Sequence, residues 1–228
     1  MSFLISLLFL SVAFADAPVE VGELKRRIFA LAESYKGQAD PDYSRQKSLD
    51  VLVKELLLAA PQPPVRERID VLAGVWEQVW GPYDYRNDNR GIDPELGIEE
   101  IYQVISADGY YYNVSPLYKN GDRTQERIGL LRGEFRLDDQ NADVLRVQFT
   151  DYPGMSRRPS DLNLWELPPL EEAGALPNRV VIVPSTIVRA FFGAGALREI
   201  YTDADMRLAY GSRGEGYDRE ALYVMKRK

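Results

Sequence analysis

The sequence predicts a mainly β protein, an antiparallel sandwich or barrel that follows an N-terminal helical segment. Apolar residues recur at helical spacing up to residue 57, and a proline run then ends that pattern. From Gly74 onward, short runs rich in Val, Ile, Tyr and Phe alternate with turn signals, and no helical pattern separates them. The chain has 228 residues, 45% of them hydrophobic, which is enough for one medium domain with its own core.

Two amphipathic helices are expected before the proline run "APQPP" at 60–64. Asp40-Pro41 is a suitable N-cap and first helical position for the second of them. We therefore divide the chain into a signal peptide at 1–15, a helical segment with its Pro-rich link at 16–64, and a β-barrel domain at 65–228. The positions that set the helical spacing are Leu24, Ile28, Leu31 and Tyr35 in the first helix and Leu49, Leu52, Val53, Leu56 and Leu57 in the second.

The β region contains one clear hairpin signal and several alternating runs. Asp108-Gly109 separates two β-rich runs within 101–114, which predicts a hairpin with a two-residue turn. The Pro-rich stretch 157–177 is expected to be a long loop, and loops of that length often carry function. Further strands are expected at 128–137, 143–152, 179–183, 197–202, 206–210 and 221–226.

The first fifteen residues, "MSFLISLLFLSVAFA", predict a cleaved secretory signal peptide. They carry no charged side chain, and Ala13-Phe14-Ala15 matches the A-x-A cleavage pattern. The stretch is shorter than the ~20 apolar residues that span a bilayer. We expect export to the periplasm or the extracellular space. A hydrophobic helix that stays attached and packs on the protein is the alternative.

Composition argues against several classes of function. The net charge is −7 and no basic stripe is interleaved with aromatic residues, so we expect no nucleic-acid partner. The terminal Lys226-Arg227-Lys228 is interpreted as a solvated tail. The chain has no Cys and no His, and so it lacks the usual thiolate and imidazole groups for metal binding and general-base catalysis. We expect no metal site, no cofactor and no catalytic residue.

Two stretches partly match ligand-binding motifs, but each has residues that the motif does not allow. In "GAGALREI" (193–200), Arg198 stands where a dinucleotide-binding fingerprint has its third glycine. In "DYRNDNRGIDPE" (84–95), Arg86 and Arg90 would replace two ligands of a calcium loop. Neither stretch therefore predicts its ligand.

Tyrosine is abundant, with fourteen in the chain, and three of them follow the expected hairpin turn at 110–112. Tyrosine has a large apolar body and one hydroxyl, which suits a pocket for a mostly apolar ligand with a polar end. Tyrosine is equally a good strand residue that is half-buried by nature. Both interpretations stay open for this run.

Gly74-Val75-Trp76, at the start of the first expected strand, is similar to the G-x-W signature of lipocalin-like barrels. From residue 22 to the end, the chain resembles the plastid lipid-associated protein (PAP)/fibrillin family. Tyr210 departs from the family pattern, which usually has a second arginine there. The matching segments are "L-x-G-x-W" at 72–76, a strand pair at 101–113 with Gln103 and Asn113, "REIYTDADMRLAYG" at 198–211 with Tyr201, Asp203, Asp205, Arg207 and Gly211, and the closing strand at 221–227.

The resemblance implies a lipocalin-like barrel and a non-enzymatic carrier of small hydrophobic molecules of lipid or isoprenoid type. Trp76 would fill the barrel floor, and Arg207 would stack on its indole as a cation–π pair worth ~0.5–2 kcal/mol. Gly74 would allow the sharp change from helix to strand. If strand alternation turns them inward, the ligand pocket would be lined by Tyr110, Tyr112, Phe135, Val147, Phe149, Met206, Leu208 and Tyr223.

Other functions stay open beside the carrier. A structural or interaction module at a lipid particle or envelope surface would use the 157–177 loop or the N-terminal helices as its contact. An enzyme would need carboxylates and tyrosines assembled inside the barrel. The resemblance also implies a plastid location as the alternative to export, if the source is an alga.

Overall fold

The computed structural model describes residues 20–82, 96–98, 100–157, 194–213 and 220–228. The signal peptide predicted at 1–15, the strand predicted at 179–183 and nearly all of the 157–177 stretch lie outside the described residues. The helices are α1 (Val21–Ser34), α2 (Ser44–Ala59), the 3-10 turn η1 (Val65–Glu67) and α3 (Ile69–Leu72). The strands are β1 (Gly74–Trp80), β2 (Leu96–Ile98), β3 (Tyr102–Ile105), β4 (Tyr110–Lys119), β5 (Asp122–Leu137), β6 (Val144–Arg157), β7 (Ala194–Thr202), β8 (Met206–Arg213) and β9 (Ala221–Arg227).

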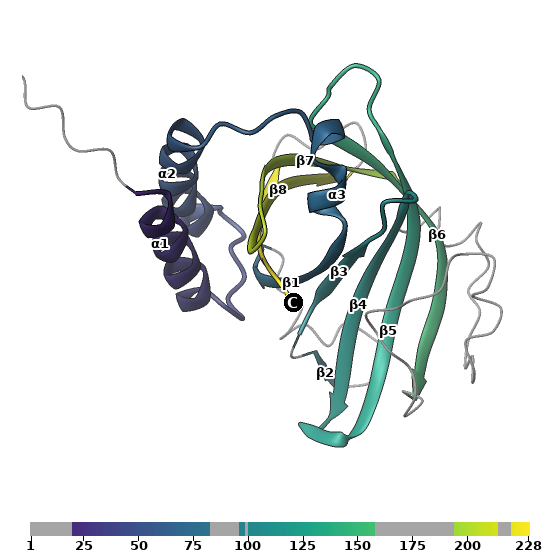
Figure 1. Ribbon diagram of the computed structural model, residues 1–228. Coiled ribbons are helices and arrows are strands. Elements are labelled where there is room, and N and C mark those ends of the chain that lie inside the picture. The colour runs from purple at the N-terminus through teal and green to yellow at the C-terminus, as the bar shows by residue number, and fades with distance from the viewer. Residues whose placement is uncertain (1–19, 83–95, 99, 158–193, 214–219) are drawn as a thin grey trace, which may run out of the picture.

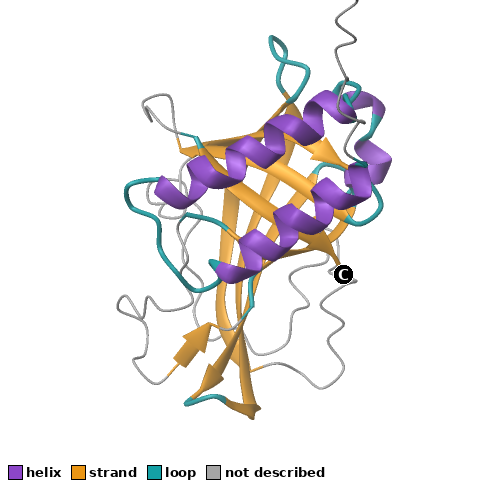
Figure 2. Cartoon of the chain, turned by 90° about the vertical axis from the view of Figure 1, so that its left-hand side faces the viewer, coloured by secondary structure: helices purple, strands orange, loops and turns teal. Residues whose placement is uncertain are grey.

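Eight of the strands close into an antiparallel barrel (Figure 1), which confirms the predicted mainly β fold with its N-terminal helical segment. Hydrogen-bonded neighbours follow the order β4-β3-β1-β9-β8-β7-β6-β5, and pairing between β4 and β5 closes the ring. Within the part of the chain that the structure describes, the short β2 pairs with the last residues of β4. The strands β4, β5 and β6 are the longest, and with β2 they extend beyond the barrel body as a ribbon (Figure 2).

Turn chemistry sets the two hairpins around β4. The predicted hairpin is confirmed, but its turn is not the two-residue one expected: Ser106 N–H donates to the Tyr110 carbonyl and Gly109 N–H to the Ser106 carbonyl, so residues 107–109 connect the strands, with Gly109 at φ +94°. The β4–β5 turn has Asn120 and Gly121 at φ +49° and +76°. Two successive positive φ angles at Asn-Gly match the twist of a tight hairpin. This second turn was not among the turns predicted from the sequence.

Helices α1 and α2 lie side by side across the outer face of the barrel (Figure 2). Their buried faces, which include Ile28 and Leu56, pack against outward side chains of β8 and β9 such as Leu208 and Val224. The second helix starts at Ser44 rather than next to Pro41, because residues 41–43 form a turn. Asp40 still satisfies the first turn, since its carboxylate accepts hydrogen bonds from the backbone N–H groups of Arg45 and Gln46. Among the described residues, no helix is long and apolar enough to cross a membrane.

The barrel interior is a single apolar cluster to which all eight barrel strands contribute, together with η1 and α3. Only the enclosed space is within reach of every strand, so this cluster marks the inside. The short α3 lies at one end of the barrel (Figure 1) and adds Leu72 to the cluster. Its members are Val65, Ile69, Leu72, Trp76, Ile105, Tyr111, Phe135, Leu145, Val147, Phe149, Leu197, Ala209, Tyr223 and Met225.

Candidate functional site

Four of the eight predicted pocket residues face the barrel interior. Residues that pair across neighbouring strands point to the same face of a sheet, so strand register assigns each side chain. Phe135 pairs with Val147, Gly133 pairs with Phe149, and Ala209 pairs with Tyr223. Phe135, Val147, Phe149 and Tyr223 all belong to the interior cluster.

The other four predicted pocket residues point outward, which corrects the prediction. Tyr110 and Tyr112 belong to a cluster on the outer face of β3–β5, and the inward residue of that run is Tyr111, opposite Gly133. Met206 and Leu208 pack under α1 and α2. In both cases the strand is apolar on its outer face as well, so hydrophobicity alone did not identify the inner face.

Trp76 lies in the interior cluster at the α3 end of the barrel, here called the floor, and Arg227 rather than Arg207 covers its indole. The guanidinium carbon of Arg227 lies 4.1 Å from the Trp76 ring centroid. Arg227 also donates hydrogen bonds to the carbonyls of Ala73 (3.0 Å) and Val71, and Trp76 Nε1 donates to the Leu72 carbonyl (2.8 Å). Arg227 therefore ties the last strand to α3 and is part of the floor rather than of a solvated tail.

Gly74 is required at this floor for two reasons. Its φ is +140°, which a side chain disfavours, and a Cβ there would collide with the guanidinium of Arg227. The glycine thus permits the turn from α3 into β1 and also leaves room for the arginine on Trp76.

Arg207, the residue expected to stack on Trp76, instead forms a buried ion pair with Glu199. Both side chains have no exposed surface. The guanidinium donates to the two Glu199 carboxylate oxygens at 2.9 and 2.6 Å, to Gln103 Oε1 at 2.6 Å, and to the sulfur of Met225 at 3.1 Å. Since Arg207 lies on β8 and Gln103 on β3, this side chain links strands that are not neighbours in the barrel.

A second buried arginine, Arg68, fixes the segment that covers this end. It donates to the Thr202 hydroxyl (2.8 Å), the Pro63 carbonyl (3.0 Å) and the Glu199 carbonyl. Burial lowers the pKa of Arg68, and the carboxylate of Glu199 opposes that shift. The covering segment is thus held by polar contacts as well as by Leu72.

Inward-facing side chains are less completely buried away from the floor. Floor residues such as Trp76 and Met225 are fully buried. Phe149 and Tyr223 also face inward but are only half-buried. Tyr111 meets Phe149 edge-to-face with ring centroids 6.2 Å apart, and burial raises the pKa of the Tyr111 hydroxyl, which stays neutral.

Two inward amides lack partners. Gln78 pairs with Met225 in register, and Asn113 pairs with Gln103, so both side chains share the face of the Arg207 network. Gln78 Nε2 and Asn113 Oδ1 are buried and have no hydrogen-bond partner. A buried polar atom without a partner costs about 1–3 kcal/mol, so these two atoms are sites where a bound molecule would gain hydrogen bonds.

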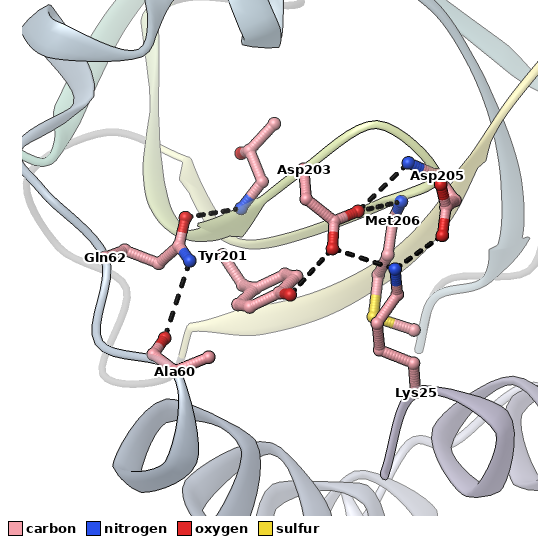
Figure 3. A network of polar contacts seen from close by, with 8 residues as sticks. Lys25, Ala60, Gln62, Tyr201, Asp203, Asp205 and Met206 are labelled. Carbon is pink, nitrogen blue, oxygen red and sulfur yellow. Dashed lines mark hydrogen bonds and ion pairs between the residues drawn. The ribbon is translucent and has the colours of Figure 1, made fainter. Parts of the chain in front are cut away.

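The acidic turn after β7, which contains Asp203 and Asp205, holds helix α1 against the barrel (Figure 3). Asp203 accepts hydrogen bonds from Lys25 Nζ (2.8 Å) and the Tyr201 hydroxyl (2.7 Å), and from the backbone N–H groups of Asp205 and Met206. Lys25 reaches this turn from α1 and also pairs with Asp205 at 2.5 Å. Tyr201, Asp203 and Asp205, which carried part of the family resemblance, therefore fasten α1 to the barrel.

Tyr210, the departure from the family pattern, also fastens a helix. Its hydroxyl donates to Asp50 of α2 at 2.6 Å, and the Arg198 guanidinium lies 4.8 Å from its ring centroid. Together with the turn that precedes it, the outer face of β8 thus combines apolar packing with specific polar contacts to both helices.

No family model matches the chain, and neither do curated proteins or solved structures. The resemblance to the PAP/fibrillin family stays a prediction. Among the described residues, no group of three or more Asp or Glu side chains could hold a metal ion.

Sequence reasoning missed several residues of the interior. Glu199 and Gln78 carried no signal, because an isolated Glu or Gln in a strand is usually exposed. Tyr111 is in the tyrosine run, but the prediction placed its neighbours Tyr110 and Tyr112 on the inner face instead. Gln103 and Asn113 were named only for the resemblance, and the structure places both inside, next to each other in register.

Proposed function

We propose that the protein binds a small, mainly apolar molecule inside the barrel. A single observation carries this proposal: the aromatic side chains Phe149 and Tyr223 face the interior away from the floor and are only half-buried, whereas Leu72, Trp76 and Met225 at the floor are fully buried. In a barrel whose interior is filled by its own side chains, inward aromatic residues would be fully buried.

The chemistry of the wall supports an apolar ligand. Tyr111, Phe149 and Tyr223 offer large ring surfaces, and such surfaces gain about 25 cal/mol for each Å² removed from water. Barrels of about eight strands have room for one small ligand when side chains do not fill them. The floor built by Trp76 and Arg227 would set the depth of the site.

Titration with N-phenyl-1-naphthylamine, which fluoresces strongly only in apolar surroundings, tests the proposal. We expect saturable binding of about one probe per chain. Phe149→Ala should weaken it about tenfold by removing ring contact. Phe29→Ala is the matched control, because Phe29 is also a half-buried aromatic residue but belongs to α1, outside the barrel.

Unsaturable binding, or equal weakening by the two variants, would contradict an interior site. Native mass spectrometry of protein from its own host would then show whether any apolar molecule accompanies the chain. An empty chain that also ignores the probe would favour an interaction module instead.

A further inference from the structure

Gln78 and Asn113 form a polar step on the inner wall of the barrel. Gln78 lies on β1, and Asn113 lies on β4, with β3 between them. Gln78 is 4% exposed, and a Cβ on Gly81 would lie 3.2 Å from its Nε2 and 2.8 Å from the Tyr223 ring, so the amide lies close to that ring. The step therefore adjoins the half-buried aromatic wall.

The unpartnered atoms are a donor on Gln78 and an acceptor on Asn113. A ligand that satisfies both must accept one hydrogen bond and donate another, directly or through one water. A hydroxyl does both with a single oxygen. A carboxylate can only accept, so it would leave the Asn113 oxygen facing another oxygen.

The hydrogen-bonding atoms of the charged groups nearby are engaged, except for the Nε of Arg227, which is buried without a partner. Every guanidinium nitrogen of Arg207 has a partner, and both Glu199 oxygens accept from it. All three nitrogens of Arg68 are likewise bonded. The terminal nitrogens of Arg227 are held by carbonyls at the end of α3. An ionised ligand group would therefore have to compete with these existing contacts for a counter-charge, which makes its burial costly.

We propose that Gln78 and Asn113 receive the polar end of the ligand and that this end is an uncharged hydroxyl on an apolar body, as in a long-chain or polycyclic alcohol. This inference rests on the proposed function. It adds the polarity and the orientation of the ligand, with its polar end toward the Arg207 network and its apolar body along Phe149 and Tyr223.

Displacement of N-phenyl-1-naphthylamine by three twelve-carbon amphiphiles tests the inference in the full chain. At neutral pH, 1-dodecanol is uncharged, dodecanoate is an anion and dodecylamine is a cation. We expect 1-dodecanol to bind at least fivefold more tightly than either ion. Gln78→Met, which keeps the volume and removes the amide, should weaken 1-dodecanol by about five- to thirtyfold and leave the probe within twofold.

Asn113→Leu provides a second variant with the same expected pattern. Gln140→Met is the matched control, since Gln140 is exposed at the β5–β6 turn. Without ligand, Gln78→Met should have an unchanged or higher melting temperature, because it removes a buried amide that lacks a partner.

The inference fails on its own if the probe binds but the three amphiphiles compete equally, or if Gln78→Met leaves 1-dodecanol binding unchanged. A clear drop in the melting temperature of ligand-free Gln78→Met would also overturn it, because the amide would then be partnered by the protein. Absence of any probe binding would instead overturn the proposed function, and the inference with it.

Discussion

Arg207 and Glu199 show how a single buried pair organises the inside of this barrel. A charge without exposed surface is tolerated only when it is neutralised and hydrogen-bonded. Arg207 meets both conditions through Glu199 and Gln103, and so links β8, β7 and β3. The indole of Trp76 is covered instead by Arg227, which also donates a hydrogen bond to the Ala73 carbonyl at the end of α3.

We expect Arg207→Met to lower the free energy of unfolding by about 3–5 kcal/mol, because it leaves Glu199 buried without a counter-charge. The double variant Arg207→Met/Glu199→Leu should recover part of that loss. Urea denaturation of the three proteins checks this. If the double variant were less stable than the single one by another 3 kcal/mol or more, the pairing would not be the source of the cost.

At the scale of elements, the α1–α2 pair is docked by an apolar face and by polar contacts at its edges. Burial raises the pKa of the Asp203 carboxyl, but hydrogen bonds from Lys25, Tyr201 and two backbone N–H groups outweigh it, so the pKa lies below its ordinary value. Burial lowers the pKa of Lys25, and the contacts with Asp203 and Asp205 outweigh that effect and raise it. The contact is therefore fully charged at neutral pH.

A depressed carboxyl pKa contributes stability above the unfolded value of about 3.9, and that contribution is lost as pH falls through the folded pKa. We expect Asp203→Asn to cost about 1 kcal/mol at pH 7, since the contact is partly exposed, and the difference from the parent protein to shrink toward zero below pH ~3. Chemical denaturation at several pH values measures this difference. Asp205→Asn is the control and should cost less, because Asp205 is largely exposed. A difference that grew on acidification would contradict the assignment.

At the scale of the whole molecule, the barrel is closed by contacts between distant parts of the chain. β1 pairs with β9, and Arg227 reaches back to the carbonyls that precede Gly74. The seal at one end and the half-buried aromatic wall beyond it are both consequences of this closure.

Gly74→Ala should open the floor, because its Cβ would displace Arg227 from Trp76 and would occupy a disfavoured backbone region. We expect a loss of about 2–4 kcal/mol in unfolding free energy and a red shift of Trp76 emission. Gly121→Ala is the matched control: Gly121 also has a positive φ, +76°, but a Cβ there meets nothing within 4 Å. Equal losses in the two variants would show that backbone conformation alone, and not Arg227, requires Gly74.

The β pattern, the hairpin at Gly109 and the packing faces of α1 and α2 could be predicted from the sequence, because each depends on neighbours within a few residues. The inner face of each strand could not. Trp76 faces inward and Trp80 outward although both have even numbers, because a bulge between Gln78 and Trp80 shifts the register. A second bulge separates inward Glu199 from outward Tyr201 in the same way.

The sequence by itself therefore determined that this chain forms an antiparallel β fold behind two amphipathic helices, with Gly74 and Trp76 at the start of the first strand. Only the tertiary structure decided which residues line the interior, that Arg227 rather than Arg207 covers Trp76, and that Gln78 and Asn113 face inward without partners. The physical reason is that the alternation of side chains along a strand tells which residues share a face, but not which of the two faces points inward. Which face points inward depends on the β-bulges and on what packs against the outer face. Both are determined only when distant strands and helices come together.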